Sequence, residues 1–111
     1  MDQINAMLLS MASEAPAAAL LGMMAGRRAS MLAALAAALG TLMTHPIVWY
    51  GALRLYQVMD YWPAFAIVET YAILCETVVY RVLTGLAWDR SFALSAAANW
   101  ASILLGWALI G

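Results

Sequence analysis

The sequence has very little charge for its length. Only 10% of the 111 residues are Asp, Glu, Lys or Arg, whereas soluble proteins carry about a quarter, and 67% are apolar. Five basic and six acidic side chains give a net charge of −1, which provides no basic surface for nucleic acid. The composition therefore excludes a nucleic-acid-binding protein and indicates an integral membrane protein that contacts the lipid bilayer.

Cysteine and catalytic signatures are also scarce. Cys75 is the single cysteine, which excludes an intramolecular disulfide and a CxxC metal or redox site. The chain has no Gly-rich phosphate loop, no HExxH motif and no nucleophile with a base at a recognisable spacing. We therefore do not expect an enzyme, and the residues name no cofactor. Asp2 stands where a secretory signal carries basic residues, so the N-terminus is expected to belong to the mature protein.

Long apolar runs are the main feature that is present. About 20 helical residues cross a ~30 Å hydrocarbon core. The predicted spans cover residues 6–25, 31–53, 63–86 and 91–111. Glu14 and Pro16 lie inside the first span, which predicts a kink at Pro16 or, as an alternative, a break into an interfacial piece and a short helix. The expected fold is an all-α bundle of four transmembrane helices in a single domain, residues 1–111.

Small residues predict where the helices pack closely. Gly22 and Gly26 form a GxxxG pair, and Gly40 with Thr44 adds a second small-residue step. In the last span the small and polar residues fall four, four, three and four apart on one face: Ser91, Ser95, Asn99, Ser102 and Gly106. We expect this seam to pack against a neighbouring helix, with Asn99 hydrogen-bonding across it.

The distribution of arginine predicts the orientation. Arg27, Arg28, Arg81 and Arg90 border the first and third connections, whereas only Arg54 borders the second. Basic residues are retained on the cytoplasmic side of a membrane. Both termini are therefore expected outside a bacterial-type inner or plasma membrane. Without the first span, the N-terminus would instead lie inside.

Five polar side chains fall at similar depths in the predicted spans. Glu69 and Glu76 are seven residues apart and share one face of the third span. With a rise of ~1.5 Å per residue from each midpoint, Glu14 falls at the bilayer centre, and Glu76 and Asn99 about 3 Å inward. His45 lies about 4 to 5 Å and Glu69 about 7 to 8 Å outward. We therefore expect His45 to pair with Glu69, and Glu76 with Asn99, away from lipid.

Three kinds of chemistry suit this set of side chains. It can relay protons, because histidine titrates near neutrality. It can bind a divalent metal, with His45, Glu69 and Glu76 as candidate ligands. It can also be a neutral hydrogen-bonded network that fixes helix register. The leading expectation is cation handling, of protons or a divalent metal, in a transport-type assembly; the alternative is a non-catalytic structural or assembly subunit of a membrane complex.

The small side chains of the predicted helices bear on the oligomeric state. Four Ala-rich helices enclose a pathway poorly, so we expect a homo-oligomer or other membrane subunits as partners.

Four spans with Glu14 in the first are similar, at that level only, to the small multidrug resistance exporters. Pro16 follows this glutamate, and the Glu69/Glu76 pair has no counterpart that we can place. The arginine bias also differs from that of dual-topology members, so the residues assign no family.

Overall fold

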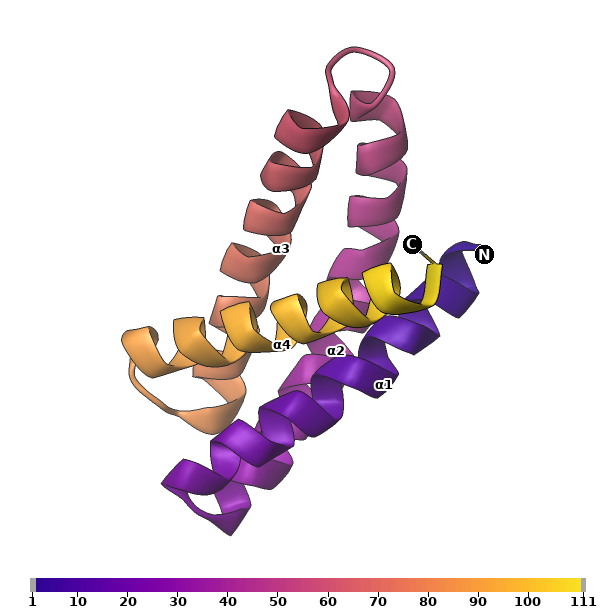
Figure 1. The fold of residues 1–111 in the computed structure, drawn as a ribbon. Helices are drawn as coiled ribbons and strands as arrows, with labels where there is room; N and C mark the ends of the chain where they lie inside the picture. The colour runs from indigo at the N-terminus through magenta and orange to yellow at the C-terminus, as the bar shows by residue number, and fades with distance from the viewer. Residues whose placement is uncertain (1, 111) are drawn as a thin grey trace.

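The computed structural model describes residues 2–110, and nearly all of them are helical. The elements are α1 (Gln3–Gly22), a short 3₁₀ helix η1 (Met23–Ala25), α2 (Arg27–Leu55), α3 (Tyr61–Thr84) and α4 (Trp88–Ile110) (Figure 1). Each α-helix begins two to four residues before the span predicted from the sequence. The prediction of an all-α fold with four helices is confirmed.

The helix ends follow from local side chains and backbone angles. The Asp2 carboxylate accepts a hydrogen bond of 2.8 Å from the Asn5 backbone N–H, which caps the start of α1. Gly26 precedes α2 with φ of 113°, and Gly85 ends α3 with φ of 72°. Glycine adopts such positive φ angles without the steric cost that a Cβ atom would impose. These glycines therefore set where the first and third turns fall.

Neither proline inside a helix interrupts it. The first helix runs from Gln3 to Gly22 through Pro16, and α2 continues through Pro46. The alternative in which the first segment breaks at Pro16 into two pieces is therefore wrong. A proline removes one backbone hydrogen bond, but the helix can continue through it when packing against neighbouring helices stabilises the segments on both sides. The kink at Pro16 stays a prediction.

Three helical segments are long and apolar enough to cross a membrane: Gln3–Ala25, Arg27–Leu55 and Trp88–Leu109. This property suggests that the protein inserts into a membrane. Helix α3, which was also expected to span, is not among them, and it carries Glu69, Glu76 and Arg81. The prediction of four spans is thus supported for three helices.

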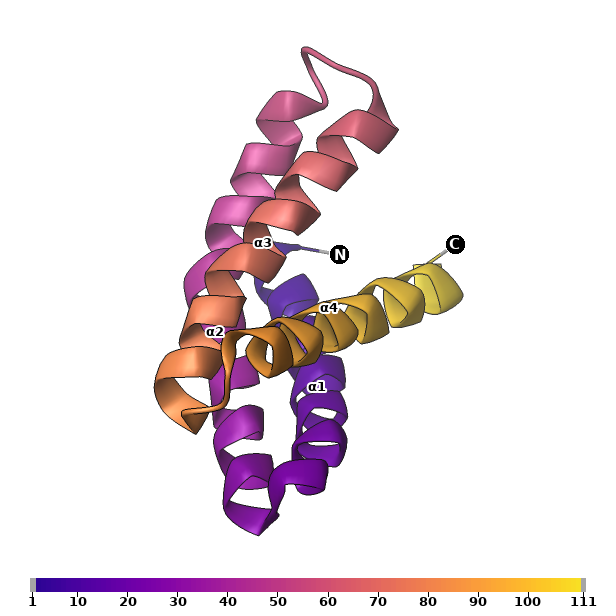
Figure 2. The same ribbon diagram turned by 90° about the vertical axis from the view of Figure 1, so that its left-hand side faces the viewer.

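The four helices pack in a closed circuit. Helix α1 contacts α2 and α4, and α3 contacts the same two helices, so α1 and α3 occupy opposite corners. Figures 1 and 2 show α2 and α3 as a hairpin whose connection projects beyond the other helices. In both views α4 crosses this hairpin at a steep inclination instead of running alongside it. The interior of the molecule lies between these four helices.

Small side chains form most of the core. The main buried cluster consists of Ala18, Ala33, Ala36, Ala37, Tyr80 and Leu94. At Gly22, an added Cβ atom would lie only 3.0 Å from the Ser30 Cα atom, so α1 and α2 approach closely there. The Ser30 hydroxyl donates a hydrogen bond of 2.7 Å to the Ala19 carbonyl across this contact. Close backbone approach of this kind is typical of helices that pack within a membrane.

Candidate functional site

A polar pocket of about 80 Å³ lies inside the circuit of helices. The five side chains that the sequence places at similar depth all line it: Glu14, His45, Glu69, Glu76 and Asn99. Hydroxyl groups of Ser10, Thr41, Thr44 and Ser102 complete most of the polar lining. A volume of this size accommodates a few water molecules. The pocket therefore gathers three carboxyl groups, one imidazole and several hydroxyl groups from all four helices.

Glu76 is the most enclosed carboxyl group, with 2% of the residue exposed. The Thr44 hydroxyl donates a hydrogen bond of 3.1 Å to its Oε2 atom. Its Oε1 atom is buried and has no hydrogen-bond partner among residues 2–110. A Cβ atom at Gly40 would lie 3.0 Å from the Glu76 Cγ atom, so the glycine makes room for this side chain against α2.

Glu14 approaches Glu76 from the opposite corner of the circuit. Its residue is 3% exposed, and its Oε1 atom accepts a hydrogen bond of 3.2 Å from the Thr41 hydroxyl. The Glu14 side chain also neighbours the Glu76 and Ser102 side chains. Two ionised carboxylates can only accept hydrogen bonds. A single proton on either group would therefore supply the donor that the Glu76 Oε1 atom lacks.

Asn99 lies beside this carboxyl pair but is held by its own helix. Its Nδ2 atom donates a hydrogen bond of 2.8 Å to the Ser95 carbonyl, and its side chain also neighbours the Glu76 carboxyl group. The bond across the seam comes from Ser95 instead, whose hydroxyl donates to the Ile73 carbonyl of α3 at 2.7 Å. The Asn99 amide thus hydrogen-bonds to its own helix, and its side chain also lies beside Glu76, the residue with which we expected it to pair.

His45 and Glu69 lie at the side of the pocket nearer the hairpin connection, and both are half-buried. The expected pairing of these two differs from the structure, because the His45 Nδ1 atom faces the Gln3 Nε2 atom at 3.3 Å. Both residues also line a second pocket of about 300 Å³, whose walls include Trp49, Tyr61 and other aromatic side chains. They therefore connect the carboxyl pair to an aromatic pocket between α2 and α3.

The candidate metal ligands do not converge. Among residues 2–110, no three His, Cys, Asp or Glu side chains gather closely enough to hold a metal ion. His45, Glu69 and Glu76 were the expected set. His45 faces Gln3, and seven residues separate Glu69 from Glu76, which is about 10 Å along a helix. The described part of the chain therefore offers no set of ligands for the divalent metal ion that we expected as one possibility.

Several hydroxyl groups in or beside the site were not assigned to it from the sequence. Thr41 and Thr44 each donate to a carboxyl group, and Tyr80 has a fully buried side chain whose hydroxyl oxygen has no partner within residues 2–110. Tyr80 follows Glu76 by one helical turn and faces the same interior. The two threonines lie one and four residues after Gly40 in the sequence. This spacing alone predicts helix packing and does not identify them as donors to a carboxyl group.

The small residues expected to pack helices divide into two groups. Gly22, Gly40 and Ser95 make close contacts with a neighbouring helix. Gly26 lies in the turn after η1 with open space around it, and Gly106 likewise has no atom near the position of a Cβ. The structure differs from the expectation at these two glycines, because neither position meets another helix. The Ser102 hydroxyl donates to the Asn99 carbonyl at 2.9 Å and lines the polar pocket.

The residues that meet in the pocket come from four different helices, so no short sequence motif describes them. No protein-family model, no curated protein and no solved structure matches the chain.

Proposed function

We propose that this is a membrane protein that handles protons in a transport-type role, with Glu14 and Glu76 as the exchanging pair. The observation that carries the proposal is the Glu76 Oε1 atom, which is buried beside a second carboxyl group and has no hydrogen-bond partner within residues 2–110. Buried polar atoms are normally hydrogen-bonded. A proton shared by the pair would satisfy this atom, and its departure would leave two carboxylates in one enclosed site.

A route for the proton is available on one side of the pair. His45 and Glu69 line both the polar pocket and the aromatic pocket, so they lie between the pair and the hairpin end of the molecule. Imidazole and carboxyl groups both accept and donate protons, and threonine hydroxyls can connect such groups because they donate and accept hydrogen bonds. We assign His45 and Glu69 the role of delivering protons to the Glu14–Glu76 pair.

The rival function, a structural or assembly subunit, is favoured by a different observation. Thr41 and Thr44 each hold one carboxyl group by a hydrogen bond, as a network that fixes helix register would require. Such a network stabilises a fold when all of its members are satisfied. The unpartnered oxygen of Glu76 and hydroxyl of Tyr80 are the features that favour proton exchange over this rival.

The proposal includes a fourth span and a defined orientation. Helix α3 can cross the membrane with the others because Glu76 faces the interior and Glu69 a pocket, not lipid. We place both termini outside, with a homo-oligomer or other membrane subunits completing the pathway. In a chain with Cys75 replaced by Ala, a cysteine at Gln57 should react with an impermeant reagent from outside, whereas one at Ala87 should not. The reverse labelling would overturn the orientation.

Proton flux into vesicles tests the proposed function. Purified protein is reconstituted into vesicles that contain a pH-sensitive dye, and a proton gradient is imposed. Glu76→Gln and Glu14→Gln should each lose flux, because an amide keeps the shape of the side chain but cannot ionise. Asp60→Asn is the matched control, since this exposed acid precedes α3 outside the site. Undiminished flux in both Gln variants, or none in the wild type under any gradient, would leave the structural subunit as the function.

A further inference from the structure

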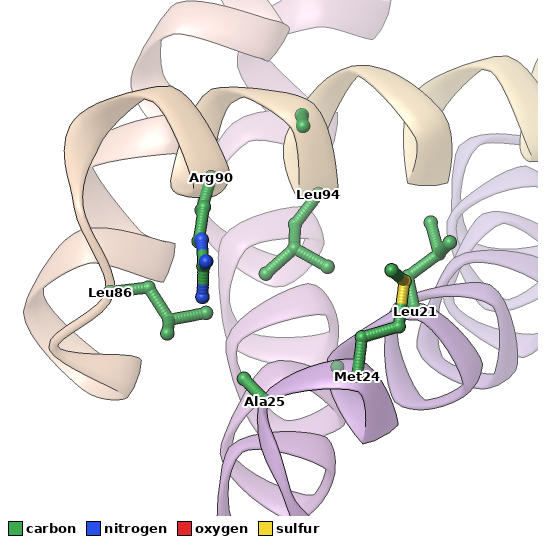
Figure 3. A pocket seen from close by; sticks show the side chains of 8 residues that line it. Leu21, Met24, Ala25, Leu86, Arg90 and Leu94 are labelled. Carbon is green, nitrogen blue, oxygen red and sulfur yellow. The ribbon is translucent and has the colours of Figure 1, made fainter.

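A pocket at the other end of the molecule is not used by the carboxyl pair. It has a volume of about 300 Å³ and lies between the end of α1, η1, the α3–α4 connection and the first turns of α4. Its walls are almost entirely apolar side chains, including Leu21, Met24, Leu86 and Leu94 (Figure 3). Sites for small molecules begin at about this size. The pocket is therefore large enough for part of an amphiphilic ligand.

Arg90 is the only charged residue that lines this pocket. Figure 3 shows its side chain reaching from α4 into the gap, toward Leu86 and Ala25. Its backbone N–H donates to the Asp89 carboxylate at 2.9 Å, but its guanidinium group makes no hydrogen bond to another residue in the described part of the chain. A guanidinium group presents a fork of donors that suits phosphate and carboxylate oxygens. The pocket thus combines an apolar wall with one available cation.

Arg81, at the same end of the molecule, has a structural role. The Arg81 Nη1 atom donates to the Gly85 carbonyl at 3.1 Å and to the Leu86 carbonyl at 2.8 Å. Its guanidinium carbon also lies 5.6 Å from the centroid of the Trp88 ring. These contacts fix the end of α3 to the following connection. Arg81 is therefore occupied within the fold, and Arg90 is not.

We infer that this pocket binds an anionic phospholipid, with the lipid phosphate on Arg90 and an acyl chain along Leu21 and Leu94. Arg27 and Arg28 are exposed at the start of α2, so this end of the molecule is positively charged. In the orientation proposed above, on which this inference rests, the same end lies on the cytoplasmic side, where anionic lipids are concentrated. Basic pockets between membrane helices on that side are suited to anionic head groups.

Native mass spectrometry of the full chain in detergent tests the inference. The protein is titrated with dioleoylphosphatidylglycerol, with dioleoylphosphatidylcholine and with glycerol phosphate, which has the head-group chemistry but no acyl chain. The wild type should retain phosphatidylglycerol in preference to the other two. Arg90→Gln should weaken its retention about fivefold, as expected for one arginine at an anionic lipid. Arg54→Gln, at the exposed last turn of α2, is the matched control and should behave as the wild type.

A second variant keeps the test independent of how Arg90→Gln folds. Met24 is 88% exposed at the wall of the pocket that Arg90 also lines, so Met24→Glu adds a negative charge to this wall without disturbing the core. It should reduce phosphatidylglycerol retention in the same way. Equal retention of the two lipids by the wild type, or unchanged retention in both pocket variants, would overturn the inference. Retention of glycerol phosphate as strong as that of phosphatidylglycerol would overturn the role of the acyl chain.

Discussion

The two halves of α3 carry the same acidic side chain in opposite surroundings. Around Glu76, small residues such as Gly40 and Ser95 bring α2 and α4 close, and the carboxyl group is buried against a second one. Around Glu69, seven residues earlier, aromatic side chains line a pocket between α2 and α3, and the carboxyl group is half-buried. The burial of each glutamate therefore depends on the size of the residues on the helices that face it.

Filling the space at Gly40 should have the largest effect on this difference. Gly40→Val places atoms where the Glu76 Cγ atom already lies 3.0 Å from a Cβ position, and the buried side chain has little room to retreat. Overpacking of this kind costs about 1–3 kcal/mol in the free energy of unfolding. Gly51→Val, also in α2 but with open space around it, should stay within about 0.5 kcal/mol. Equal thermal unfolding of the two variants in detergent would refute the close contact.

Removing the hydroxyl donor of Glu76 should give the next largest effect. Thr44→Val keeps the shape of the side chain but removes the hydroxyl group, which lies 3.1 Å from the Glu76 Oε2 atom and 2.9 Å from the Gly40 carbonyl oxygen. An unpartnered buried polar atom costs about 1–3 kcal/mol. Thr70→Val, exposed on α3, is the matched control. The comparison fails if both substitutions change the unfolding temperature by the same amount.

Replacing an aromatic side chain beside the Glu69 half of α3 should have the smallest effect on the free energy of unfolding. The Trp107 ring lies 6.0 Å from the Phe65 ring and 6.2 Å from the Trp62 ring, measured between centroids. Trp107→Leu should cost about 0.5–1.5 kcal/mol, the usual range for aromatic pairs, and leave the carboxyl pair intact. Trp100→Leu is the control, because this ring on the same helix is exposed to a similar degree but pairs with no other aromatic ring among residues 2–110. Loss of proton flux in Trp107→Leu would show that the two halves are not separable.

The sequence predicted the helices well because each one is a long apolar run between arginines, glycines and prolines. Residue counting also brought Glu14, Glu76 and Asn99 to one level, since every helix rises by about 1.5 Å per residue. It did not indicate which side chains meet. That Glu14 faces Glu76 depends on α1 and α3 standing at opposite corners of the circuit, which depth along a single span does not specify.

The inclination of α4 explains the differences along the last helix. Depth estimates assume parallel helices, whereas α4 crosses the hairpin steeply (Figures 1 and 2). Ser95 therefore meets the Ile73 carbonyl of α3, while Gly106 on the same face has open space beside it. The threonines were missed for a related reason, because a hydroxyl one turn from a glycine has the same spacing whether it packs a helix or holds a carboxylate.

Infrared spectroscopy of the reconstituted protein tests the shared proton most directly. The wild type should show the C=O stretch of one protonated carboxyl group, and this band should shift in D₂O as the proton exchanges. Glu76→Gln and Glu14→Gln should each abolish it, because the new amide donates to the remaining carboxylate in place of the proton. Glu69→Gln should retain it. A wild type without the band, or a band that survives both substitutions in the pair, would contradict the account.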